Sequence, residues 1–174
     1  MGKKLGISPV KIRKDISFCQ KNGCKGVGYE VYGLTKSIKR VLGIDNTWPA
    51  ILIGAGNLGR SLINHQPFQE LGLNIIAVFD CDLNKIGNFI NGIQVKSTKE
   101  LKKTIRKTNI KTAILTVPAS EAEDVALELV KAGVKAIWNF APVSLQIGNN
   151  IVVIYNDISS GAASLICRLN NVGQ

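Results

Sequence analysis

The 174-residue sequence predicts an α/β fold that is built on a parallel sheet with helices on both faces. From residue 50 onward, short apolar runs alternate with amphipathic segments of helical period. The apolar runs are continuous, which is typical of strands that are covered on both faces. We expect these strands at about 50–54, 74–79, 112–117, 134–139 and 151–155.

The segments between these strands carry helix signals. Ser97 with Glu100, and Ser120 with Glu123, have the spacing of capping boxes at two predicted helix starts. The predicted helices lie at about 57–65, 97–107 and 120–132, and a short strand pair is predicted at 89–95.

The first strand of this pattern leads into Gly54-Ala55-Gly56-Asn57-Leu58-Gly59, a G-x-G-x-x-G motif followed by a helix pattern. Gly54 permits a tight turn, and Gly56 lets the backbone approach a pyrophosphate. Gly59 lets the helix pack close to the sheet, while the helix N-terminus offers N–H groups to the phosphates. The motif in this context predicts a Rossmann-like, dinucleotide-binding domain.

Asp80 ends the next apolar run, 21 residues after Gly59. A carboxylate at this place is expected to accept hydrogen bonds from an adenosine ribose and to repel a 2′-phosphate, which favours NAD⁺ and NADH over the phosphorylated cofactors. Two other interpretations stay open. The domain can be a Rossmann-like fold that holds coenzyme A or no nucleotide, and Asp80, like Asp82, can simply cap the following segment.

Composition bounds the function further. No apolar run approaches the 18 residues or so of a membrane-spanning helix, and no secretory leader is recognisable behind Met1. Four cysteines without a C-x-x-C pair, and a single histidine, argue against a zinc site and favour reduced thiols in the cytoplasm. We therefore expect a cytoplasmic protein without a metal centre.

Positive charge is concentrated at the start of the chain. Residues 1–50 carry ten Lys and Arg against three Asp and Glu, whereas residues 51–174 carry twelve against nine. This asymmetry is compatible with a polyanion partner for the first segment or with a basic surface that is only solvated.

The first segment has its own pattern of elements. Ile7 to Cys19 is predicted to be a helix, with Ser8 as N-cap, Pro9 at the first helical position and Lys11, Arg13 and Lys14 on its outer face. A glycine-rich turn and short strand follow at residues 21–31. A second helix is expected at about 34–42, ending at Gly43, and a linker at 45–49.

A helix predicted from Asp157 or Ser159 to about Asn170 is more apolar than a lone surface helix should be. We interpret it as an association helix, with ordinary packing inside one chain as the alternative.

Several motifs now resemble one family, the redox-sensing transcriptional repressors called Rex. The segment Gly6–Asp15 resembles the family's recognition helix, and Lys25–Tyr29 resembles its wing. Trp48–Gly59 resembles its linker and nucleotide turn. Further matches lie at Val78–Asp80, Thr116–Ala119 and Asn139–Val143, so that the resemblance spans about residues 5–158.

The resemblance implies a homodimer that binds operator DNA when NAD⁺ dominates and releases it when NADH binds. It implies a winged-helix segment that is partial in this sequence, and a C-terminal helix that is exchanged between subunits. Tyr29 is expected to bond across the dimer to Asp157 and to register the bound cofactor. The implied DNA contacts are Ser8, Lys11, Arg13, Lys14 and Lys25, and the implied cofactor contacts are Gly54–Gly59, Asp80, Val117, Pro118 and Asn139.

An enzyme is disfavoured by the residues available. A dehydrogenase needs a proton donor or acceptor near the carbon that exchanges hydride. The only histidine, His65, is predicted away from the carboxyl ends of the strands, where Pro118, Asn139 and Pro142 offer no general acid. We therefore expect binding without turnover.

The sequence thus predicts a repressor that responds to the NADH/NAD⁺ ratio. The alternatives are a CoA- or nucleotide-binding Rossmann protein without DNA binding, and an NAD-binding remnant that dimerises but regulates nothing. The predicted divisions are a partial winged helix at 1–46, a Rossmann domain at 47–156 and a dimerisation helix at 157–174.

Overall fold

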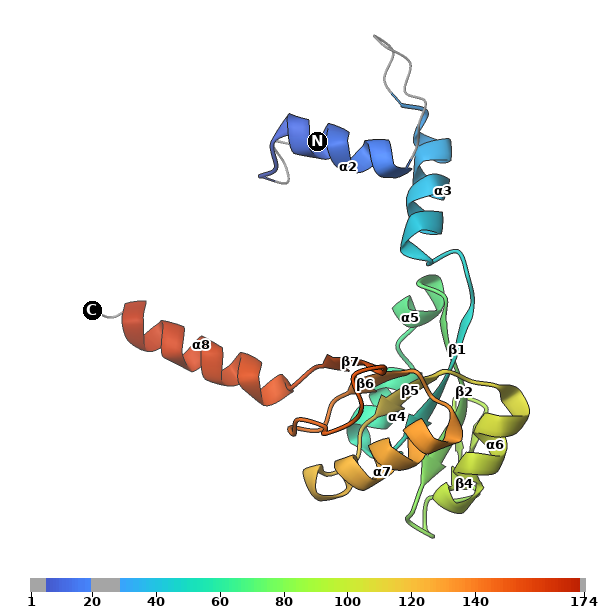
Figure 1. Cartoon of the computed structure of the whole chain (residues 1–174). Helices are drawn as coiled ribbons and strands as arrows, with labels where there is room; N and C mark the ends of the chain where they lie inside the picture. The colour runs from blue at the N-terminus through green and yellow to red at the C-terminus, as the bar shows by residue number, and fades with distance from the viewer. Residues whose placement is uncertain (1–5, 20–28, 173–174) are drawn as a thin grey trace. The chain divides into compact units, whose positions relative to one another are not determined.

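The computed structural model describes residues 6–19 and 29–172, and the chain divides into two compact units (Figure 1). One unit comprises Met1–Thr47 with Glu70–Gly72, and the other comprises Trp48–Gln69 with Leu73–Gln174. In the first unit, helix α2 (Pro9–Cys19) packs against helix α3 (Val31–Leu42).

The second unit is a seven-stranded sheet in the order β3-β4-β2-β1-β5-β6-β7. All neighbouring strands are parallel except β3 and β4, which form an antiparallel pair. The strands are β1 (Trp48–Ile53), β2 (Leu73–Asp80), β3 (Phe89–Ile90), β4 (Ile93–Ser97), β5 (Thr112–Leu115), β6 (Ala136–Asn139) and β7 (Val152–Tyr155).

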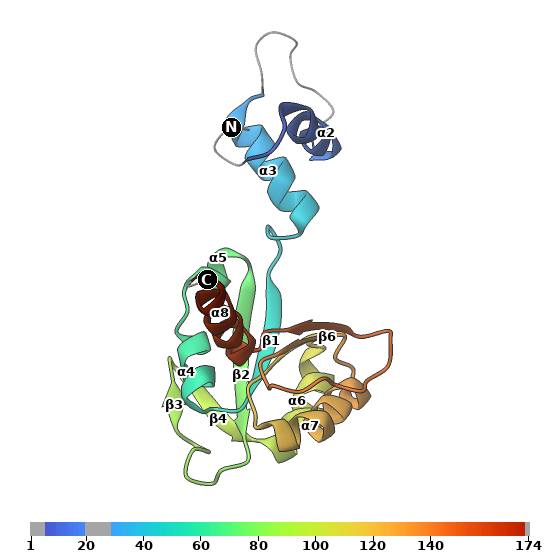
Figure 2. The same cartoon turned by 90° about the vertical axis from the view of Figure 1, so that its left-hand side faces the viewer.

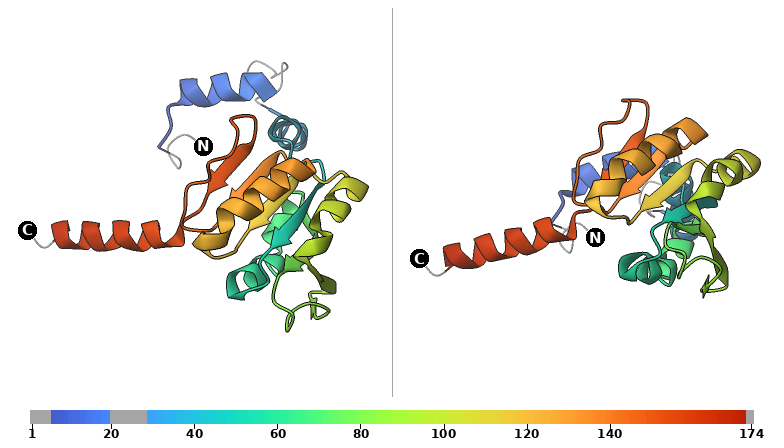
Figure 3. Two further views of the ribbon diagram at one scale, coloured as in Figure 1. Left: turned by 60° about the horizontal axis from the view of Figure 1, so that its bottom comes forward. Right: turned by 90° about the horizontal axis from the view of Figure 1, so that it is seen from below.

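Helices cover both faces of this sheet, as the two turned views show (Figures 2 and 3). Alternate residues of β1 enter two separate cores: Ile51 and Ile53 pack with α6 and α7, and Leu52 packs with α4. The helices and the 3-10 turn are α4 (Asn57–Ile63), α5 (Pro67–Glu70), η1 (Thr98–Glu100), α6 (Leu101–Thr108), α7 (Ala119–Ala132) and α8 (Ile158–Val172).

The predicted fold class is confirmed, because continuous apolar strands did indicate burial on both faces. Residues Ala50–Leu52 of β1 are wholly buried, and the same holds for Ala113–Leu115 of β5. The predicted strand pair at 89–95 is also present, as β3 and β4.

Several predicted boundaries are wrong. Trp48 and Pro49 belong to β1 rather than to a linker, since they continue the parallel register with β2. Helix α3 begins at Val31 instead of Leu34 because the Glu30 carboxylate accepts hydrogen bonds from the amides of Tyr32 and Gly33. The short strand predicted in this region lies mostly outside the described residues, and Val31 is helical.

The capping box predicted at Ser120 and Glu123 is absent. Helix α7 starts one residue earlier, at Ala119, and its N-cap residue Pro118 makes no side-chain cap bond. The Glu123 carboxylate instead accepts a hydrogen bond from the amide of Gln146, at 2.9 Å. At the other predicted box, Ser97 caps η1 by accepting from the amide of Lys99.

Candidate functional site

The turn after β1 is clamped between the two neighbouring strands. Gly54 has a φ of +101°, and its amide donates to the carbonyl oxygen of Phe79 on β2 at 2.8 Å. A Cβ at Gly54 would lie 2.6 Å from the carbonyl oxygen of Thr116, which follows β5. The position therefore requires glycine for both its backbone angle and its closeness to β5.

The other two glycines of the motif differ in their surroundings. A Cβ at Gly59 would lie 2.1 Å from the carbonyl oxygen of Gly54, so only glycine lets α4 sit this close to the turn. A Cβ at Gly56 would meet nothing within 4 Å. Gly56 is the N-cap residue of α4 and lines a cavity, so its missing side chain leaves the backbone open to a ligand.

Asp80, at the end of β2, is 5% exposed and is held by three groups of the chain. Its Oδ2 accepts from the amide of Ala55 at 2.7 Å and from the Lys85 ammonium at 3.2 Å. Its Oδ1 accepts from the amide of Asp82 at 2.9 Å. Burial raises the pKa of Asp80, but the amides of Asp82 and Ala55 together with Lys85 outweigh burial and hold that pKa below its ordinary value.

This environment gives Asp80 a structural role that spacing alone did not predict, because its carboxylate ties the nucleotide turn to the end of β2. Asp80 also caps the segment that follows it, which was the alternative interpretation. Asp80 accepts from the amide two residues ahead, and Asp82 does the same with the amide of Asn84. Since a carboxylate offers about four acceptor positions, about one remains on Oδ1 for a ligand.

Thr116 connects the end of β5 to the same turn. Its hydroxyl lies 3.0 Å from the carbonyl oxygen of Ile53 and 2.8 Å from that of Gly54, so its single O–H is shared between these two acceptors. Sequence reasoning placed Val117 and Pro118 at the site but missed Thr116 and Lys85. Thr116 stood in the Thr116–Ala119 match to the Rex family, within the strand predicted at 112–117. Lys85 carried no signal beyond its position three residues after Asp82.

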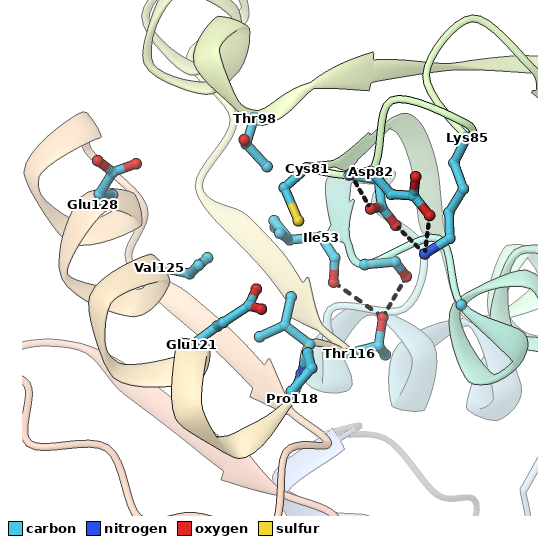
Figure 4. Close-up of a pocket in the computed structure, with 14 residues that line it drawn as sticks. Ile53, Cys81, Asp82, Lys85, Thr98, Thr116, Pro118, Glu121, Val125 and Glu128 are labelled. Atoms are coloured by element: carbon cyan, nitrogen blue, oxygen red, sulfur yellow. Dashed lines mark hydrogen bonds and ion pairs between the residues drawn. The ribbon is translucent and has the colours of Figure 1, made fainter.

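A cavity of about 510 Å³ opens at the carboxyl ends of β1, β2 and β5 (Figure 4). In the strand order found here, β1 and β5 flank the point where the order reverses, which is where open α/β sheets bind ligands. The cavity is lined by Ile53, Gly54, Gly56, Asp80, Cys81, Asp82, Lys85, Thr98, Thr116, Val117, Pro118, Glu121, Val125 and Glu128.

The wall opposite the turn comes from α7 and is acidic (Figure 4). Glu121 and Glu128 lie on either side of Val125, and Glu128 pairs with Lys102 of α6 at 3.4 Å. This pair joins the two helices that cover one face of the sheet.

The remaining predicted cofactor residues do not line this cavity. Ala55 is buried, Asn57 and Leu58 begin α4, and Gly59 packs under the turn. Asn139 is fully buried after β6, and its amide group bonds Ala141 and Val143 of its own loop.

Four of the five predicted DNA contacts lie directly before α2 or in its first half. The Ser8 hydroxyl accepts from the amide of Lys11 at 3.3 Å, as expected of an N-cap. Lys11, Arg13 and Lys14 are exposed, and Arg13 Nε donates to the carbonyl oxygen of Pro9 at 3.3 Å. Lys25 lies outside the described residues.

The predicted switch residues lie in different units of one chain. Tyr29 is half-buried, and Asp157 caps α8 by accepting from the amide of Ser159 at 2.8 Å. The expected bond joins two subunits, so it stays a prediction.

His65 lies after α4, is exposed and stacks edge-on against Phe68 with ring centres 4.7 Å apart. Within residues 6–19 and 29–172, no group of three or more His, Cys, Asp or Glu is placed to hold a metal ion. None of the helices in that part of the chain is long and apolar enough to cross a membrane.

The chain is similar to known proteins over most of its length. Residues 45–143 match the family described as CoA binding domain. The chain is 41% identical over 155 residues to the redox-sensing transcriptional repressor Rex of Carboxydothermus hydrogenoformans, an overlap that covers 89% of this chain and 74% of that one.

Two complexes of RSP, a Rex-family repressor, are among the solved structures that are similar over 99% of the chain. One is the repressor RSP in complex with β-NAD⁺ and operator DNA, with a TM-score of 0.92, 32% identity and 79% of that chain covered. The other is RSP in complex with β-NADH, with a TM-score of 0.84, 31% identity and 80% of that chain covered.

Proposed function

The chain belongs to the Rex family of redox-sensing transcriptional repressors, and from this premise we propose that it binds operator DNA and releases it when NADH binds. The observation that carries the proposal is the cavity at the ends of β1, β2 and β5, which joins the glycine turn to Asp80. Its volume of about 510 Å³ lies within the range of small-molecule sites.

The residues around this cavity fit a dinucleotide. The open space beside Gly56 leaves room for a pyrophosphate along the backbone, at the point where α4 begins. The remaining acceptor position on Asp80 Oδ1 suits one ribose hydroxyl. When bound, the cofactor supplies a nicotinamide ring that is cationic in NAD⁺ and neutral in NADH, and Val117 and Pro118 contribute apolar contacts at the far wall.

We assign DNA contact to α2. Lys11 and Lys14 neutralise phosphates, and Arg13 is suited to a guanine edge because its planar group donates two parallel bonds. Ser8 and Lys25 add contacts to the phosphates of the DNA backbone. Binding of this kind releases counterions, so its affinity falls with salt concentration.

The C-terminal helix supports a homodimer. Ile158, Leu165, Ile166 and Leu169 of α8 are each about 60% exposed within one chain. Full burial of such a side chain contributes about 1.5–3 kcal/mol. This gain favours a dimer in which a second copy of the chain covers α8. Val152 and Ile154 of β7, the strand that precedes α8 in the chain, are exposed as well.

Coupling between the two sites is assigned to Tyr29 and Asp157 of opposite subunits. Each residue lies next to a helix that belongs to one of the two functions. Tyr29 precedes α3 of the DNA-binding unit, and Asp157 caps α8, the proposed dimerisation helix. A bond between them in one cofactor state alone biases the dimer toward one conformation.

The test is a fluorescence-anisotropy titration of the full chain on a duplex that carries the RSP operator, at fixed and stated salt. With NAD⁺ present the chain is expected to bind, and added NADH is expected to release the DNA. Arg13→Ala is the matched control, because it should weaken DNA binding and leave NADH binding unchanged. NADH binding without any DNA binding by the unaltered chain would overturn the repressor assignment.

One alternative has a specific observation behind it, since the match to the CoA binding domain family covers the whole cavity. If coenzyme A is the ligand, it should raise the melting temperature more than NADH does at equal concentration. Membership in a family of regulators favours binding without turnover. A repressor of this kind acts in the cytoplasm, where its operator lies.

A further inference from the structure

Lys85 stands at the ribose end of the cavity, in contact with both carboxylates there. Its Nζ lies 3.2 Å from Asp80 Oδ2 and 3.6 Å from Asp82 Oδ2 (Figure 4). The Lys85 side chain is 33% exposed, whereas the Asp80 side chain is 6% exposed. All three residues line the cavity.

The backbone holds this arrangement in place. The amides of Lys85 and Ile86 donate to the carbonyl oxygen of Asp82, at 3.0 and 3.1 Å. The Asp82 carboxylate accepts from the amide of Asn84 at 2.9 Å, which closes the same turn. Lys85 is therefore presented to Asp80 by a short hydrogen-bonded turn rather than by a free loop.

The charges at this end are arranged differently from those of a lone aspartate, although their sum is the same. Two carboxylates face one ammonium, so the local net charge is one negative unit instead of two. A group that hydrogen-bonds Asp80 Oδ1 at about 2.8 Å lies within about 8 Å of the Lys85 ammonium on Oδ2, which is about the Debye length at physiological salt. The hydrogen bond to Asp80 raises the pKa of Lys85 above that of an ordinary lysine, which is itself charged at neutral pH.

We propose that Lys85 is a specificity-determining residue that sets how strongly the site discriminates against a dinucleotide with a 2′-phosphate. Asp80 and Asp82 repel that phosphate and Lys85 attracts it, so the observed preference is the difference between these effects. The proposal rests on the proposed function, because it presupposes that the cavity binds a dinucleotide. The proposal also gives a reason for the presence of Lys85 in the cavity wall, because Asp80 could repel a 2′-phosphate without a neighbouring cation.

The test measures the dissociation constants of NADH and NADPH for the full chain and three variants by isothermal titration calorimetry. In Lys85→Met, NADPH affinity should fall about tenfold more than NADH affinity, because the negative charge is no longer offset. In Asp82→Asn, which keeps the acceptor for the amide of Asn84, the affinity for NADPH should rise relative to the affinity for NADH. Lys85→Arg retains the charge and should leave the ratio within about twofold of the unaltered chain.

The outcomes separate a charge role from a structural one. If Lys85 only props Asp80, Lys85→Met weakens NADH and NADPH equally and the ratio stays constant, which overturns the proposal. Opposite shifts of the ratio in Lys85→Met and Asp82→Asn, both reduced at high salt, support it. Failure of the unaltered chain to bind NADH at all would overturn the proposed function instead, and CoA titrated in parallel identifies that case.

Discussion

At the residue scale, the three glycines of the nucleotide turn have different physical reasons to be glycine. Gly54 needs a positive φ, and Gly59 needs the absence of a Cβ against backbone. Gly56 needs neither, since its φ is −76° and the space beside it is open. The open space beside Gly56 agrees with the proposed approach of a ligand to the backbone at this position.

Gly56→Ala and Gly59→Ala should consequently separate binding from stability. Gly56→Ala is expected to keep the melting temperature within a few degrees and to weaken NADH binding by about tenfold or more, because the methyl group occupies the space of the pyrophosphate. Gly59→Ala is expected to cost several kcal/mol, because its Cβ overlaps the carbonyl oxygen of Gly54. Thermal unfolding and NADH titration check both. Loss of fold in Gly56→Ala would contradict this division of roles.

Asp80 belongs to the same scale, and it couples stability to pH. Its pKa in the folded chain is lowered, so its contribution is present above the unfolded value of about 3.9 and is lost as pH falls through the folded value. Asp80→Ala should destabilise the chain by about 1–3 kcal/mol at pH 7, since the amides of Ala55 and Asp82 lose their acceptor.

The measurement for Asp80 is urea unfolding of the unaltered chain and Asp80→Ala between pH 7 and pH 3. The difference in unfolding free energy should shrink below about pH 4. A difference that is constant over this range would mean that ionisation of Asp80 contributes nothing to stability. Asp80→Ala should also weaken NADH and NADPH together, since it releases the turn, while reducing the preference between them.

At the element scale, α8 combines helical geometry with a lack of cover. Every described side chain of residues 158–171 is exposed, although one stripe of the helix is apolar. A stripe of that kind indicates burial in the assembled protein. The prediction of an association helix followed from the same apolar positions.

Leu165→Glu combined with Leu169→Glu should therefore produce a monomer. Two carboxylates in the apolar stripe carry a desolvation cost that no partner group offsets. Asn171→Glu is the matched control, because Asn171 lies on the opposite side of the helix and should leave the dimer intact. Analytical ultracentrifugation measures the mass, and a double variant that stays dimeric would remove α8 from the interface.

At the scale of the whole molecule, the two units differ in how much core they contain. Strands β1 and β5 are wholly buried at their centres, and two apolar clusters flank the sheet. Among the described residues of the first unit, α2 and α3 contain no buried residue, and Phe18 and Tyr32 are largely exposed. The stability of the chain therefore resides in the sheet.

Hydrogen exchange should report this difference directly. Amides of β1 and β5 are expected to be protected by several orders of magnitude more than those of α2 and α3, because their opening requires unfolding of the sheet. Operator DNA should slow exchange in α2 while leaving the sheet amides unchanged. Equal protection of α2 and β1 in the free chain would contradict the assignment.

Much of this architecture was predictable because its signals are local. Continuous apolar runs predicted the parallel strands, and the glycine spacing predicted the turn after β1. The predicted boundaries were wrong where a side chain formed an unexpected hydrogen bond. Glu30 did so at the start of α3, and Glu123 did so with the amide of Gln146. The Glu30 cap is a local signal that the prediction missed, whereas the Glu123 bond joins residues 23 apart and depends on the fold.

The sequence by itself determined the α/β class, the nucleotide turn and the apolar stripe of the last helix, since each depends on residues close together in the chain. Only the tertiary structure decided the partners at the site. Asp80 bonds an amide 25 residues away, and Thr116 reaches a carbonyl 63 residues away. The physical reason is that strand order and register, which no local period encodes, bring the ends of β1, β2 and β5 together around one cavity.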